Sequence, residues 1–353
     1  MRVARLDIGR PATTELRGSI LTRDLVVAGG RWAKGRRLDA ADLAALAVSR
    51  PAADGLPATV TVLLLEADDL HEDEAALALA SAVAGPGLTI RGPAQSRVDL
   101  IAATDGVLHV RTAVLERLDR IDPLEVFTAF DGSIVRAGDL VASVKIAPHT
   151  IPMALLERAT RGLRGGGRSA VVRVDSFRSR RVAALVKESL RAADRGRFEA
   201  SIRAKVESLG SSLIEIAYVD DDEASVRAAL ARLTRGRNRA DVVLTAGGRS
   251  TDPLDPFFVA IGDLGGAIVR RGVPAHPGSM LWLARVGRTG ILGLPTCGAY
   301  SKATAADLVL PRLLTGERPG PAMVAGLGHG GLLSRDQRFR FPSYARDLDA
   351  PER

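Results

Sequence analysis

The sequence contains a single cysteine, Cys297, few aromatic residues and no long apolar run. One cysteine cannot form an internal disulfide, and a cysteine-based metal site is not expected. No stretch approaches the roughly 18 consecutive apolar residues that span a bilayer. The N-terminal segment MRVARLDIGRPATTELRG lacks the apolar core of a secretory signal. These absences predict a cytoplasmic protein without a membrane partner.

Lysine is also scarce, although the chain is basic. Only five of the 49 basic residues are lysine, and the formal net charge is +8. A nucleic-acid surface combines its cations with exposed aromatic side chains for stacking. Aromatic residues make up 4% of this chain and the arginines are scattered, so nucleic acid is not the predicted partner. The charge favours small anionic molecules such as phosphates.

The length of 353 residues predicts two or three domains. Residues 1–150 form a predicted β-rich α+β region, because short apolar runs alternate there with Gly, Pro and Asp turns. Residues 151–180 begin as a helix and pass into a Gly/Arg-rich linker. Eight arginines from Arg158 to Arg181 form either an anion-binding face or a solvated linker. Residues 319–353 form a predicted irregular tail.

Residues 181–318 alternate between strand and helix patterns. DVVLT (241–245) is typical of a buried strand, and Asp220 and Glu223 predict a capping box for the helix that follows. Repeated strand–helix units predict a three-layer α/β/α domain with a mostly parallel sheet. In such sheets ligands bind beyond the carboxyl ends of the strands. A helical apolar stripe is formed by Phe198, Ile202, Val206 and Leu209.

The most informative segment is DVVLTAGGRSTDPLDP (241–256). Gly247 and Gly248 let backbone N–H groups approach a phosphate or a ring edge closely, and Ser250 can donate a hydrogen bond to an anion. The following helix N-terminus adds partial positive charge. Asp252 and Asp255 are candidate ligands for Mg²⁺ or groups that polarise a nucleophile. Alternatively, one of these two aspartates is the N-cap of the helix.

Three motifs in order carry a family resemblance. ADVVLTAGGRSTDPLDP is followed by GVPAHPGSM and by GILGLPTCGAYSKATAADLVLPRLLTGE. Over roughly residues 175 to 318 the chain resembles the molybdopterin-binding fold shared by molybdopterin molybdotransferases and adenylyltransferases. The resemblance implies that the Gly-Gly-x-Ser loop and its acidic residues hold the pterin phosphate and a metal. Pro277, Gly278, Pro295, Thr296 and Cys297 would complete the pocket.

The resemblance also implies a catalytic trio of Glu188, Asp252 and Asp255. Two of the departures from molybdotransferases bear on catalysis: Ser279 follows Pro-Gly where they carry a lysine, and residues 1–150 contain no Met-Asp-Gly motif. Both changes remove groups that stabilise developing charge, which favours binding over turnover. Cys297 contacts the pterin or its metal, or is a small packed residue.

The predicted function is therefore molybdopterin binding in molybdenum cofactor biosynthesis or delivery. One form of it is a Mg²⁺-dependent transferase that inserts molybdate into adenylated molybdopterin. The alternative is a non-catalytic chaperone or scaffold that serves a molybdenum hydroxylase. Because members of this fold are usually oligomeric, a homodimer is expected.

Overall fold

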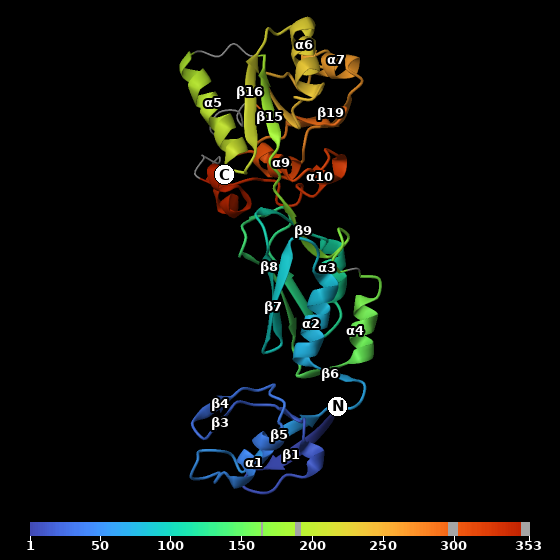
Figure 1. Ribbon diagram of the computed structural model, residues 1–353. Helices are drawn as coiled ribbons and strands as arrows, with labels where there is room; N and C mark the ends of the chain where they lie inside the picture. Colours follow the sequence, from blue (N-terminus) through green and yellow to red (C-terminus); the bar gives the residue numbers. More distant parts are fainter. Residues whose placement is uncertain (164, 188–191, 296–302, 347–353) are drawn as a thin grey trace. The chain divides into compact units, whose positions relative to one another are not determined.

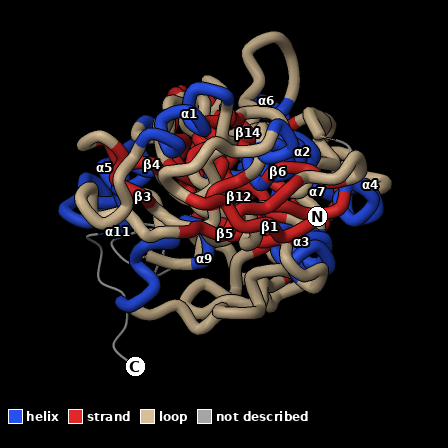
Figure 2. Tube along the Cα trace, turned by 90° about the horizontal axis from the view of Figure 1, so that it is seen from below, coloured by secondary structure: helices blue, strands red, loops and turns tan. Residues whose placement is uncertain are grey.

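A computed structural model describes residues 1–163, 165–187, 192–295 and 303–346 of the chain. These residues divide into two compact units (Figure 1). Both units contain strands and helices; Figure 2 colours these elements along the chain. Among the described residues, no helix is both long enough and apolar enough to cross a membrane. The first unit comprises Met1–Thr104, His109–Asp131 and Arg136–Val174; the second comprises Asp105–Leu108, Gly132–Val135 and the chain from Asp175 onward.

The first unit is built from small antiparallel sheets and short helices. One sheet has the strand order β1-β5-β2, another β10-β12-β8-β7, while β3 pairs with β4 and β6 pairs with β13. Its strands are β1 (Arg2–Asp7), β2 (Ile20–Leu21), β3 (Leu25–Val27), β4 (Gly30–Trp32), β5 (Thr59–Leu64), β6 (Asp69–His71), β7 (Leu88–Ala94), β8 (Arg97–Ala102), β10 (Leu124–Thr128), β12 (Leu140–Ile146) and β13 (Thr150–Pro152). Its helices are η1 (Thr14–Leu16), α1 (Ala40–Val48), α2 (Glu72–Val83), α3 (Thr112–Asp119) and α4 (Met153–Thr160).

Three further short strands lie in the sequence where the chain passes between the units: β9 (Gly106–Val110), β11 (Ile134–Val135) and β14 (Val172–Ser176). Within the second unit, β11 pairs with the first residues of β9 in antiparallel fashion.

The second unit is organised around a six-stranded sheet with the order β16-β15-β17-β20-β19-β18. Strands β16, β15, β17 and β20 are parallel to one another. Strand β19 pairs with both β20 and β18 in antiparallel fashion. The strands are β15 (Arg181–Val186), β16 (Ser212–Tyr218), β17 (Val242–Ala246), β18 (Ala267–Arg271), β19 (Trp282–Val286) and β20 (Thr289–Gly293). The helices are α5 (Ala192–Glu207), α6 (Glu223–Thr234), α7 (Pro256–Asp263), α9 (Ala305–Leu314), α10 (Pro321–Ala325), η2 (Arg335–Arg340) and α11 (Ser343–Arg346).

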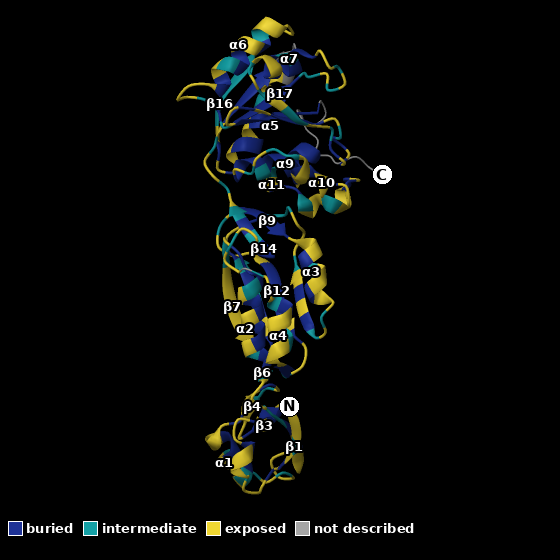
Figure 3. Cartoon of the chain, turned by 90° about the vertical axis from the view of Figure 1, so that its right-hand side faces the viewer, coloured by how far each residue is buried: buried dark blue, intermediate teal, exposed yellow. Residues whose placement is uncertain are grey.

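Successive side chains of this sheet pack on opposite faces, as the period of two requires. On β15, Ala184 packs in the core that includes α5, α9 and the C-terminal segment, whereas Leu185 packs in the core that includes α6 and α7. The central strands β17 and β20 of this sheet are buried throughout, whereas the outer strands β16 and β18 are more exposed; Figure 3 colours the chain by burial. The mixed α/β character predicted from the pattern is confirmed, because this sheet packs against helices. The predicted stripe on α5 is buried. Its members are Phe198, Ile202, Val206 and Leu209.

The predicted capping box at Asp220 and Glu223 is wrong. Helix α6 is capped by Asp222, whose side chain accepts a hydrogen bond from the Ser225 N–H at 2.8 Å. Three consecutive aspartates precede the helix, and the sequence alone does not show which of them reaches the first-turn amides. The later start leaves Asp220 and Asp221 in the loop after β16.

Candidate functional site

Polar residues gather at the carboxyl ends of the parallel strands of the second unit. Because β16, β15, β17 and β20 run in parallel, these ends lie along one edge of the sheet. Lys187 directly follows β15, Asp221 lies three residues beyond β16, and Gly247 directly follows β17. The edge therefore brings charged side chains and a glycine loop from separate parts of the sequence together.

Lys187 is the centre of this group. Its side chain is 0% exposed, and its Nζ lies 2.6 Å from Asp221 Oδ1 and 2.8 Å from Asp255 Oδ2. The ammonium also lies 5.4 Å from the centroid of the Phe257 ring. A buried charge is tolerated when it is paired and hydrogen-bonded. Asp221 and Asp255 provide this pairing. The ammonium therefore links the end of β15 to the loop after β16 and to the start of α7.

Asp255 is the N-cap of α7, which is one of the two interpretations its sequence context left open. It is 1% exposed, and its Oδ1 accepts the Phe257 N–H at 2.9 Å. Its Oδ2 accepts the Arg249 N–H at 2.7 Å in addition to the Lys187 ammonium. Both oxygens of this carboxylate are thus engaged by the protein.

The predicted use of Asp252 and Asp255 as a Mg²⁺ pair does not fit this donor set. Mg²⁺ requires carboxylate oxygens at about 2.0–2.1 Å with near-octahedral geometry, and the oxygens of Asp255 are already bound to N–H groups and an ammonium. Within the described ranges, no group of three or more His, Cys, Asp or Glu side chains is arranged to hold a metal ion. Of the two predicted magnesium ligands, only Asp252 has an accessible carboxylate; its side chain is 41% exposed.

Arg249 extends the charged group toward solvent. Its side chain is 58% exposed, with Nη2 3.2 Å from Asp221 Oδ2 and Nε 3.7 Å from Asp252 Oδ2. Among the described residues, no acceptor is paired with the backbone N–H groups of Gly248 and Ser250. The loop therefore combines an accessible guanidinium with two available amide donors, which is the equipment of an anion site.

Three aromatic rings support the loop. Trp282 is 2% exposed, and its ring centroid lies 6.1 Å from that of Phe257 and 5.1 Å from that of Phe258. A Cβ atom at Gly248 would lie 3.3 Å from the Phe257 ring, and one at Gly293 would overlap the Trp282 indole. The absence of side chains at these positions lets the strand ends close over the tryptophan.

The Pro277-Gly278 motif packs against the start of α9. The Pro277 carbonyl accepts the Ala305 N–H at 2.9 Å, and a Cβ atom at Gly278 would come within 2.8 Å of the Ala305 nitrogen. Thr304 caps α9 by accepting the Ala306 N–H at 3.2 Å. The motif thus determines how closely α9 approaches.

A second buried ion pair lies beside α9. Lys205 of α5, 2% exposed, pairs with Asp307, 1% exposed. The Lys205 ammonium also lies 5.2 Å from the centroid of the Tyr344 ring. Burial, with the nearby Asp307 carboxylate, raises the pKa of Tyr344 well above its ordinary value near 10.0.

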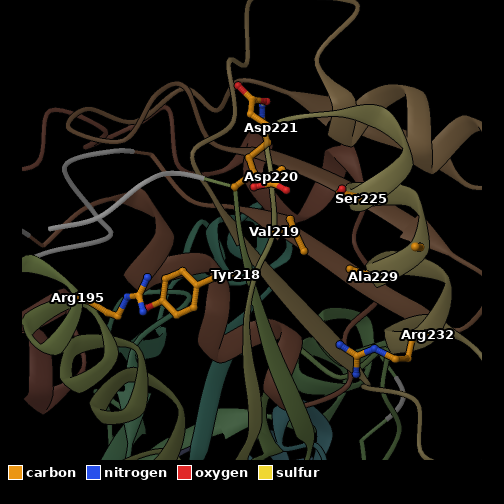
Figure 4. A pocket seen from close by; sticks show the side chains of 10 residues that line it. Arg195, Tyr218, Val219, Asp220, Asp221, Ser225, Ala229 and Arg232 are labelled. Atoms are coloured by element: carbon orange, nitrogen blue, oxygen red, sulfur yellow. The ribbon is translucent and has the colours of Figure 1, made fainter. Parts of the chain in front are cut away.

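A cavity of about 710 Å³ opens beside the charged group. Figure 4 shows Arg195 of α5, Tyr218 of β16 and Arg232 of α6 around it, with Asp220 and Asp221 at the strand end. The Arg195 guanidinium lies 4.2 Å from the centroid of the Tyr218 ring. The volume falls in the range of small-molecule sites. Its full lining is Lys187, Arg195, Tyr218, Val219, Asp220, Asp221, Ser225, Ala228, Ala229 and Arg232.

Residues 188–315 match a protein family described as "Probable molybdopterin binding domain". The second half of the chain carries a molybdopterin-binding-family domain. This confirms the family resemblance that the sequence motifs indicated. No curated protein matches the chain.

Solved structures of molybdenum cofactor proteins are similar to this domain at low sequence identity. Molybdenum cofactor biosynthesis protein B has 16% identity and a TM-score of 0.31, covering 40% of this chain and 96% of its own. The molybdopterin biosynthesis enzyme MoaB from Thermus thermophilus has 24% identity and a TM-score of 0.29, covering 39% and 98%. The molybdopterin biosynthesis MoeA protein from Pyrococcus horikoshii has 15% identity and a TM-score of 0.30, covering 70% and 79%.

Several of the predicted site residues lie together in the molybdopterin-binding-family domain. Pro295 follows β20 at the same edge of the sheet as the loop after β17, because β17 and β20 are parallel. Pro277 and Gly278 contact α9 instead. Glu188, Thr296 and Cys297 lie outside the described residues. The predicted residues that share the loop after β17 are Gly247, Gly248, Ser250, Asp252 and Asp255.

Sequence reasoning missed Lys187, Asp221 and Arg249. A signal for Lys187 was present, since it directly follows the apolar run VAALV and is one of only five lysines. A charged residue at the carboxyl end of a buried parallel strand is a candidate for the ligand edge. The domain therefore carries a cation at this edge although Ser279 replaces the family's lysine.

Proposed function

We propose that the chain binds molybdopterin in the biosynthesis or delivery of the molybdenum cofactor. The ligand would lie at the carboxyl edge of β15, β16 and β17, in a domain with the three-layer α/β/α molybdopterin-binding fold. The proposed setting is the cytoplasm, and the proposed assembly is a homodimer. The observation that carries the proposal is the family match together with the accessible guanidinium of Arg249 beside the Gly248 and Ser250 amides.

The phosphate of the pterin would find hydrogen-bond donors at this edge. A guanidinium binds phosphate oxygens in a bidentate manner, and Arg249 is accessible. The N–H groups of Gly248 and Ser250 are directed to no protein acceptor among the described residues. The ammonium of Lys187 is neutralised by Asp221 and Asp255, so the donors left for a phosphate are Arg249 and the loop amides. An arriving phosphate would compete with Asp221 and Asp252 for Arg249.

The cavity beside the loop supplies space for the rest of the ligand. Its volume of about 710 Å³ is large enough for a bicyclic ring with its side chain. Arg195 and Tyr218 provide a flat polar wall, and Asp220 supplies carboxylate acceptors for ring N–H groups. These features support a heterocyclic ligand with an anionic end.

The hydrogen bonds to Asp255 favour a protein that binds molybdopterin over one that catalyses molybdate insertion. A transferase that inserts molybdate with Mg²⁺ would use Glu188, Asp252 and Asp255, and both oxygens of Asp255 already accept hydrogen bonds from the protein. A carrier that delivers the cofactor to a molybdenum hydroxylase requires only retention. Incubation with adenylated molybdopterin, molybdate and Mg²⁺ separates the two: cofactor formed above the blank would favour the transferase.

The binding proposal is tested with a matched pair of glycine variants. Gly248→Leu places a side chain between the loop and the Phe257 ring. Gly262→Leu adds one on α7 where no described atom beyond the neighbouring helix backbone lies within 4 Å of the Cβ position. We expect the wild type and Gly262→Leu to retain pterin, measured as fluorescence after oxidation, and Gly248→Leu to lose it. If the wild type neither copurifies with pterin nor binds it when added, the proposal is wrong. If Gly248→Leu retains as much pterin as the wild type, the ligand does not bind at this loop.

A further inference from the structure

The opposite edge of the same sheet holds a second cleft of about 530 Å³. It lies at the amino ends of the parallel strands, between the residues that precede β15 and β17, the β19–β20 turn and the segment after α9. All of its lining belongs to the second unit. Six arginines line it: Arg178, Arg180, Arg239, Arg285, Arg288 and Arg318.

Acidic residues balance only part of this charge. Asp241 lies 3.9 Å from Arg180 and 3.4 Å from Arg239. Glu317, the other acidic residue of the lining, is held by Arg312, which lies outside it, through two hydrogen bonds of 2.8 and 2.9 Å. Within the described part of the chain, no carboxylate pairs with the four remaining arginines. These are Arg178, Arg285, Arg288 and Arg318.

A buried hydrogen-bond donor of Arg180 is a second, independent observation at this cleft. Its Nε is buried and has no hydrogen-bond partner among the described residues. Buried donors are nearly always paired with protein or with a bound molecule. Gly316 makes room for this side chain, because a Cβ atom there would overlap the Arg180 guanidinium. The cleft therefore orders an arginine whose donor has no protein acceptor.

We propose that this cleft binds a small ligand that carries two or more phosphate groups. Four unpaired guanidinium groups complement the charge of two phosphates, about −3 to −4 at neutral pH, and the guanidinium fork matches phosphate oxygens. None of the described residues that line the cleft is aromatic, and these residues therefore offer no surface on which a base or pterin ring would stack. The specificity is for the phosphate chain, and the site is separate from the proposed pterin edge.

The test is isothermal titration calorimetry of the full chain with inorganic pyrophosphate, with orthophosphate as the weaker probe. Arg288→Gln, at an exposed turn, and Arg180→Met should each weaken pyrophosphate binding about tenfold, because each removes a charged hydrogen bond. Arg227→Gln, an exposed arginine of α6, is the charge-matched control and should bind as the wild type does. If Arg180→Met does not fold, Arg288→Gln decides the outcome.

Arg249→Gln keeps this test apart from the proposed function. It should lower pterin retention and leave pyrophosphate binding unchanged, whereas Arg288→Gln should do the reverse. The proposal is overturned if pyrophosphate gives no binding heat, or if Arg227→Gln weakens binding as much as Arg288→Gln. It is also overturned if Arg249→Gln, and not Arg288→Gln, removes the binding, since the probe would then occupy the other edge.

Discussion

Replacing Lys187 by methionine tests whether this ammonium holds the strand ends together. Methionine has a similar stem and no charge, so the substitution removes the cation and keeps most of the packing. It leaves the Asp255 carboxylate buried, 1% exposed, with the N–H groups of Arg249 and Phe257 as hydrogen-bond donors and the Arg249 Nε at 4.0 Å as a remaining cation. Asp221 is 41% exposed and keeps its ion pair with Arg249 at 3.2 Å. Losing the Lys187 ammonium should therefore destabilise Asp221 little.

The expected cost comes almost entirely from Asp255. Breaking a buried ion pair by removing one partner costs about 3–5 kcal/mol. Because two amide donors remain on Asp255, we expect the lower end, about 3 kcal/mol in the free energy of unfolding of the second unit. The matched partner variant is Asp255→Asn, which keeps a side-chain acceptor at the N-cap and removes the charge. The double variant should cost about 2 kcal/mol less than the two single variants together.

Urea denaturation followed by tryptophan fluorescence measures these values. Trp282 lies in the second unit and Trp32 in the first, so a Trp32→Phe background assigns the signal to the unit that contains Lys187. The transition midpoint should fall while its slope stays constant. A cost below about 1 kcal/mol for Lys187→Met, with additive single effects, would refute the claim that this ammonium neutralises Asp255.

Two further predictions concern packing and pH. Gly293→Ala should destabilise the second unit by about 2 kcal/mol and shift Trp282 emission, because the added Cβ overlaps the indole. The control is Gly262→Ala in α7, where no described atom outside the helix's own backbone and the neighbouring residues lies within 4 Å of the added Cβ; it should stabilise the unit by up to about 1 kcal/mol. Tyr344 binds its proton more tightly in the folded state, since its pKa is raised above 10.0. Stability should therefore be complete below that pH and fall as pH rises above it; Tyr344→Phe should remove this alkaline loss in denaturation curves, and an unchanged loss would contradict it.

Local patterns were sufficient to predict much of the second unit. The stripe on α5 and the strand β17 repeat over several residues with the period of their element, so each can be read without tertiary information. The Gly-Gly-Arg-Ser segment was predictable as a loop because it follows a buried strand. Asp255 was predictable as a helix cap, although the pattern left the choice between Asp252 and Asp255 open.

The ion pairs of the site could not be predicted in this way. Lys187 meets Asp221 and Asp255 across 34 and 68 residues of sequence, and this pairing exists only once β15, β16 and β17 are adjacent. The position of Pro277 beneath α9 depends in the same way on how a later helix packs. Tertiary contacts of this kind carry no periodic signal in a single sequence.

The shared ammonium at position 187 also constrains how this protein can change over generations. A substitution at position 187 leaves the Asp255 carboxylate buried without its ammonium, and one at position 255 leaves the buried ammonium with Asp221 as its remaining partner. A second substitution, at the other position, relieves the imbalance. Viable lineages should therefore alter the two positions as a pair, most readily toward two uncharged residues of similar volume. Position 221, which faces water, should drift independently.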